Sequence, residues 1–138
     1  MEKVIKRYEM ALQTLETLKI VLDKLQGDVP EEYCLELRDS AIQRFEYSID
    51  TFWKFLKIYM QDYLKMSVES AAPRAIIKDA LTADLLSREE FEKLMNAITN
   101  RNETSHAYNE SIAQGVLEEL PELYDLMHGI IMRIKIEI

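Results

Sequence analysis

The sequence predicts an all-α protein, an antiparallel helical bundle formed by a single domain over residues 1–138. Three observations predict this fold class. The 138 residues include only three Gly and three Pro, alternating strand-like patterns last no more than a few residues, and apolar residues recur at steps of three and four. Hydrophobic residues make up 48% of the chain, which is enough for one core without disulfides. We expect one or two short helices beside the long ones.

The first long helix is predicted by an apolar stripe that ends at Gly27. Residues 28–31 (Asp-Val-Pro-Glu) are typical of a helix stop followed by a new helix start. The stripe consists of Val4, Ile5, Tyr8, Ala11, Leu12, Leu15, Leu18, Leu22 and Leu25.

The second helix is expected to be the longest, running from Glu31 to about Lys65. At about 1.5 Å per residue it would be roughly 50 Å long, and its aromatic residues make it the expected spine of the bundle. Its stripe consists of Ile42, Phe45, Ile49, Phe52, Trp53, Leu56, Tyr59, Met60, Tyr63 and Leu64. We expect Trp53 to belong to the core and not to form a base-stacking platform.

Two further helices are expected after a break at residues 67–73. The first is short, with Ile76, Ile77, Ala80, Leu81 and Leu85 facing inward. The second begins at a capping box, in which Ser87 and Glu90 satisfy each other's backbone amides, and carries Phe91, Leu94, Met95 and Ile98.

The last helical face follows a polar stretch at residues 101–108. Ile112, Val116 and Leu120 continue the helical pattern, and Pro121 is expected as the first residue of a final segment. That segment's stripe consists of Leu123, Leu126, Met127, Ile130, Ile131 and Ile134. Ile136 and Ile138 exceed the stripe, so they are either frayed or covered by another subunit. Excess apolar surface of this kind favours a homodimer.

The charge and cysteine content exclude several classes of protein. A formal net charge of −8 argues against a general nucleic-acid coat protein, although it leaves room for a small basic cleft and suits a basic protein partner. The lone Cys34 excludes an internal disulfide framework and a thiolate zinc site, which favours a reducing cytoplasm. The pattern of residues 1–20 does not resemble a signal peptide, and no stretch is long and apolar enough for a membrane span.

The candidate functional residues are concentrated in residues 101–108, Arg-Asn-Glu-Thr-Ser-His-Ala-Tyr. A guanidinium, an imidazole and a phenol at this spacing are suited to binding a phosphate, moving a proton and offering a hydroxyl. Arg101 and His106 lie about 140° apart on a regular helix, so they converge only if the helix is distorted or if two copies meet across a two-fold axis. The alternative is a loop or a frayed helix end in which Arg101 caps the preceding helix. Neither interpretation requires a metal or a cofactor.

The polar residues of the second helix also allow two interpretations. They are most simply a solvated, salt-bridged face, with Asp50 and Lys54 at i,i+4. Alternatively, Arg44, Glu46 and Lys54 line a groove for a partner or a nucleotide. The complete set is Arg38, Asp39, Arg44, Glu46, Asp50 and Lys54.

Residues 101–106, Arg-Asn-Glu-Thr-Ser-His, resemble the mark of the HEPN family, in which Arg and a polar residue precede His by a fixed spacing. The subgroup with Tyr two residues after His is matched by Tyr108. A second stretch, residues 37–54, is similar to the signature of the nucleotidyltransferase substrate-binding subgroup, in which Arg-Phe-Glu-[Phe/Tyr] and Trp-Lys recur. The resemblance covers nearly the whole chain.

The resemblance implies an up-and-down four-helix bundle with a short additional helix, usually a homodimer, bound to a minimal nucleotidyltransferase. It implies either a ribonuclease toxin, with Arg101 and His106 catalytic, Asn102 as a polar helper and Tyr108 as acceptor of a transferred nucleotide, or a non-catalytic subunit that binds the substrate. In the second case Arg101 and His106 would contact a phosphate of RNA or a nucleotide. A purely structural helical adaptor is the third hypothesis.

Overall fold

The computed structural model describes residues 1–106, 109–134 and 136, with the backbone alone for residues 105 and 106. Over these residues all regular secondary structure is helical, so the prediction of an all-α fold is confirmed. The elements are α1 (Glu2–Gln26), α2 (Glu31–Ile58), the π-helix η1 (Tyr59–Tyr63), α3 (Pro73–Thr82), α4 (Arg88–His106) and α5 (Glu110–Arg133). None of the helices in this part of the chain is long and apolar enough to cross a membrane.

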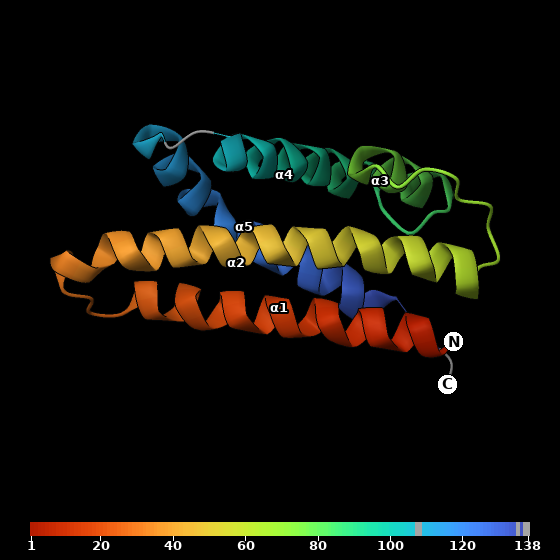
Figure 1. Ribbon diagram of the computed structural model, residues 1–138, viewed down its shortest axis with the longest axis horizontal. Helices are drawn as coiled ribbons and strands as arrows, with labels where there is room; N and C mark the ends of the chain where they lie inside the picture. The colour runs from red at the N-terminus through yellow and green to blue at the C-terminus, as the bar shows by residue number, and fades with distance from the viewer. Residues whose placement is uncertain (107–108, 135, 137–138) are drawn as a thin grey trace.

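Helix α2 is the spine of the molecule, as its length and aromatic content predicted. A short turn joins it to α1, so the two helices lie side by side and run in opposite directions (Figure 1). Helix α4 lies along another side of α2, α5 crosses obliquely behind it, and the short α3 lies near the start of α4 (Figure 1). Helix α2 contacts each of the other four helices. A side chain on α2 can therefore meet partners from several distant parts of the sequence.

The core is built around three fully buried phenylalanines of α2, Phe45, Phe52 and Phe55. Burying each of them stabilises the fold by roughly 1.5–3 kcal/mol relative to leaving it exposed. Trp53 is half-buried and packs against the core, and Phe55, which the sequence pattern omitted, takes the fully buried position.

The predicted end of α1 and the predicted start of α4 are confirmed. Helix α1 ends before Gly27, whose N–H donates to the Lys24 carbonyl at 3.1 Å. The capping box opens α4: the Ser87 N–H donates to Glu90 Oε1 at 2.8 Å, and the Glu90 N–H donates to Ser87 Oγ at 3.1 Å. Helix α3 begins at Pro73, which was predicted to belong to the preceding break; in the first turn of a helix the missing N–H of proline costs nothing.

Two predicted helix boundaries are wrong. Helix α2 does not continue regularly to Lys65; it widens into η1 after Ile58, where the rings of Tyr59 and Tyr63 stack with centroids 4.9 Å apart. Pro121 does not begin a new segment, because α5 runs through it without interruption. Pro121 is exposed. Its missing N–H leaves the carbonyl oxygen four residues earlier without its helical donor, and water can donate to that oxygen instead.

Ile134 and Ile136 lie near Ile5 and Tyr8 at the start of α1. Ile134 is buried, and Ile136 is partly buried against the core of its own chain. The second isoleucine predicted to be in excess, Ile138, lies outside the described residues.

Candidate functional site

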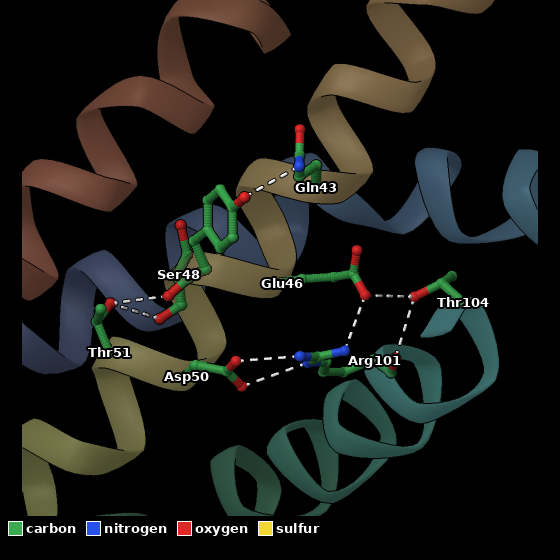
Figure 2. Close-up of polar contacts among 8 residues, drawn as sticks. Gln43, Glu46, Ser48, Asp50, Thr51, Arg101 and Thr104 are labelled. Carbon is green, nitrogen blue, oxygen red and sulfur yellow. Dashed lines mark hydrogen bonds and ion pairs between the residues drawn. The ribbon is translucent and has the colours of Figure 1, made fainter. Parts of the chain in front are cut away.

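The last turns of α4 face the middle of α2, and Arg101 makes the connection. Its guanidinium donates from Nη1 to Glu46 Oε2 at 2.9 Å and from Nη2 to Asp50 Oδ2 at 3.1 Å. A third, longer bond runs from Nε to Asp50 Oδ1 at 3.3 Å. Figure 2 shows Arg101 held between the two carboxylates. We call Arg101, Glu46 and Asp50 the arginine clamp.

The clamp follows from helical spacing. Glu46 and Asp50 are four residues apart on α2, so both side chains project from one face toward the same point on α4. The planar guanidinium meets Asp50 through two nitrogens, which is the forked geometry that arginine favours with carboxylates. Thr104 lies one turn further along α4, with its hydroxyl 3.1 Å from the Arg101 carbonyl oxygen and 3.5 Å from Glu46 Oε2.

The electrostatics of the clamp are dominated by the carboxylates. The hydrogen bond to Asp50, followed by the charges of Asp50 and Glu46, raises the pKa of Arg101, whereas partial burial acts in the opposite direction. The side chains remain partly accessible, at 29% for Arg101, 19% for Glu46 and 36% for Asp50. One positive charge therefore meets two negative charges, and an anion that binds Arg101 must displace or tolerate a carboxylate.

The other candidate residues of the motif are exposed, or their side chains lie outside the described part of the chain. Asn102 and Glu103 are exposed on α4. His106 is the last residue of α4, and its side chain lies outside the described part of the structure. Tyr108 also lies outside the described residues. The predicted convergence of Arg101 with His106 therefore stays a prediction.

The three residues predicted to line a groove, Arg44, Glu46 and Lys54, contact different parts of the molecule. The Arg44 guanidinium turns toward α1 and donates to the Thr17 carbonyl at 2.8 Å. Lys54 Nζ lies 5.7 Å from the centre of the Trp53 ring on its own helix. Of the three, Glu46 faces α4, which carries residues 101–106 and which we call the motif helix.

Arg38 corrects the interpretation of the polar face. It was grouped with solvated residues, but its side chain is 3% exposed and its guanidinium lies near Asp39 at 3.3 Å and Glu110 of α5 at 3.7 Å. The signal is present in the sequence: Arg38, Ile42, Phe45, Ile49 and Phe52 follow steps of four and three, so Arg38 occupies a position of the apolar stripe. Burial of a charge this deep requires the carboxylates that accompany it.

A second residue whose role the sequence analysis missed is Asn109, the N-cap of α5. Its side-chain oxygen accepts from the Ile112 N–H at 3.0 Å. The cap fixes where α5 begins, directly after the motif. Its signal was an Asn immediately before an apolar helical pattern. Within the described ranges, no three His, Cys, Asp or Glu residues are grouped to hold a metal ion.

The bundle and its motif helix define a class, namely small all-helical proteins with a polar, charge-paired face on the central helix. The chain belongs to the family described as nucleotidyltransferase substrate binding protein like, whose model matches residues 3–135. The family suspected from residues 37–54 is thus confirmed.

A solved structure is similar to this chain in fold and in sequence. A protein from Thermus thermophilus, known from its crystal structure, is 35% identical to this chain with a TM-score of 0.77. The match covers 90% of this chain and 98% of that one. A comparison with curated proteins gave no match.

Proposed function

We propose that this chain is the helical subunit of a two-component, toxin–antitoxin-like system, and that it binds a minimal nucleotidyltransferase and presents a substrate to it. Membership of the nucleotidyltransferase substrate-binding family over residues 3–135 carries the proposal. The net charge of −8 also suits association with a basic protein surface. In this proposal the four long helices act as an up-and-down bundle scaffold, and the chain works as a homodimer in the cytoplasm.

The arginine clamp favours a binding role for the motif helix over a catalytic one. A guanidinium shared by two carboxylates is already engaged, so it is poorly placed to stabilise new charge in a transition state. The same contacts hold α4 at a fixed position against α2. A surface that presents a substrate to another protein requires such a fixed position.

Binding assays with the nucleotidyltransferases of the same genome test the proposal. Each enzyme is produced with the chain, and complex formation is measured by co-purification and calorimetry. We expect one of them to form a stable complex, in which the nucleotidyltransferase activity depends on the helical subunit. Absence of binding to every such enzyme would refute the proposal.

Nucleotide binding is measured separately on the wild type and on Arg101→Ala. If Arg101 contacts a phosphate, the substitution weakens the affinity; equal affinity in both proteins removes Arg101 from the site.

Metal-independent RNA cleavage by Arg101 and His106 is a second candidate. The observation that favours it is the partial exposure of Arg101 in the last turns of α4, the helix that ends at His106. Cleavage of RNA in the presence of a chelator, lost in His106→Ala and retained in Asn96→Ala, would support it. In the same candidate function, Tyr108 is the acceptor of a transferred nucleotide. Incubation with the partner nucleotidyltransferase and a nucleoside triphosphate, followed by intact-mass measurement, would detect this modification.

A further inference from the structure

A hollow lies between the first turns of α2 and the first turns of α5, close to the end of the motif helix. We call it the α2–α5 hollow. Its volume is about 620 Å³, and its lining residues are Leu35, Arg38, Glu110, Ser111, Gln114, Gly115 and Glu118. On the α5 side these residues follow steps of three and four, so they form one strip along about two turns of the helix.

The shape of the hollow suits another helix. The strip extends roughly 12 Å along α5 at about 1.5 Å per residue, and it lies beside a second helix, so the hollow follows a helix axis. Gly115 lies within the strip, and a Cβ built there would meet no atom within 4 Å. A helix backbone from outside can therefore approach α5 closely at this point.

The charge of the hollow indicates which kind of partner it would bind. Glu110 has a side chain that is 64% exposed, and Glu118 is exposed, whereas Arg38 is 3% exposed and lies at the floor near Glu110 and Asp39. The accessible charge is therefore negative. The exposed Leu35, at 53%, adds an apolar contact at the rim.

We propose that the α2–α5 hollow is the docking site for a basic helix of the partner nucleotidyltransferase. This inference rests on the proposed function, because it assigns a surface to the complex proposed there. A helix carrying Lys or Arg would meet Glu110 and Glu118, and a small or apolar residue would lie over Gly115 and Leu35. A second copy of this chain fits poorly, because an isologous contact would place one negatively charged strip against another.

Two substitutions with matched controls test the docking site. Glu118→Lys reverses the charge of the strip, and Glu69→Lys makes the same change on an exposed loop residue that precedes α3. Gly115→Leu fills the strip, and Gly129→Leu makes the same change at a glycine of α5 that also has no atom within 4 Å of its built Cβ. Circular dichroism melts confirm that all four variants are folded.

The readout is the dissociation constant for the nucleotidyltransferase that the wild type binds, measured at two salt concentrations. We expect Glu118→Lys to weaken binding about tenfold at low salt and less at high salt, since salt screens rim charges. Gly115→Leu should weaken it at least about tenfold at both concentrations, while the two controls stay within about twofold of the wild type.

The outcomes separate this inference from the proposed function. If the wild type binds and both hollow variants bind equally well, the docking site is refuted and the proposed function stands. If Glu118→Lys or Gly115→Leu instead changes the oligomeric mass of the isolated chain, the hollow is a contact between copies and the inference is overturned. If the wild type binds no nucleotidyltransferase, the proposed function fails and the docking site with it.

Discussion

Arg101 shows how a single residue can be predicted to matter without its partners being predicted. The sequence identified Arg101 from its spacing to His106, but not Glu46 and Asp50, which are 55 and 51 residues away along the chain. The clamp gives Arg101 a structural role that exists whether or not the motif binds a ligand. This structural role and a ligand-binding role of Arg101 can be separated by substituting the carboxylates instead of the arginine.

Asp50→Asn tests the structural role of the clamp. We expect the free energy of unfolding to fall by about 1 kcal/mol, since two hydrogen bonds to a partly exposed charge are weakened. The measurement is urea denaturation, combined with Arg101→Met in a double-mutant cycle that should give a coupling of about 0.5–1 kcal/mol.

The matched control is Asp23→Asn, because Asp23 forms an exposed pair with Lys19 one turn away on the same helix. It should cost less than about 0.5 kcal/mol. A coupling near zero between Asp50 and Arg101 would show that the clamp does not contribute to stability in solution.

Glu46→Gln tests whether the clamp restrains ligand binding. Removing one carboxylate charge leaves Arg101 more available, so affinity for nucleotide or RNA phosphate should rise several-fold if Arg101 belongs to the binding site. Fluorescence anisotropy with a labelled oligonucleotide measures this. Unchanged affinity would place the ligand elsewhere.

At the scale of the helix, the sequence predicted the start of α4 correctly and the course of α5 incorrectly. The capping box of α4 was predicted in detail because all its atoms come from four consecutive residues. The interior of α5 was predicted incorrectly because the cost of Pro121 depends on whether the helix is stabilised elsewhere. Its packing against α1, α2 and α4 provides that stabilisation.

Ser87→Ala tests the capping box. We expect a loss of about 1 kcal/mol in the free energy of unfolding, because the Glu90 N–H loses its acceptor. Ser67→Ala, a change of the same type at a loop residue outside any helix, should be nearly neutral. A loss of equal size in both variants would contradict the assignment.

The two glycines of α5 provide a second test at this scale. Gly115→Ala and Gly129→Ala should each raise the free energy of unfolding by up to about 1 kcal/mol, since alanine is the better helix former and its Cβ meets no atom within 4 Å. Thermal or urea unfolding measures the change. Destabilisation at either position would mean that its surroundings are tighter than the structure indicates.

At the scale of the whole molecule, an ion pair holds the end of α5 against the start of α4. The Arg133 guanidinium meets Glu90 through two bonds of 2.9 Å and also donates to the Leu85 carbonyl at 2.8 Å. The hydrogen bond from Arg133 lowers the pKa of Glu90 below its ordinary range, although partial burial acts in the opposite direction. The stabilisation is therefore complete above the unfolded-state pKa of Glu90 and is lost as the pH falls through the lower folded-state pKa.

Glu90→Gln tests this linkage. The wild type should be more stable than the variant by about 1 kcal/mol at pH 7, and the difference should shrink as the pH is lowered from about 5 toward 3. Urea denaturation at several pH values measures it. A difference independent of pH would show that the carboxylate charge is not the source.

The sequence by itself determined the all-helical class, the approximate helix limits, most of the core and the family, because these depend on spacing and on contacts within a few residues. Only the tertiary structure decided that Arg101 lies between Glu46 and Asp50 and that α2 and α5 border a hollow. Those features depend on how separate helices rotate and cross, which is set by side-chain packing across the whole core.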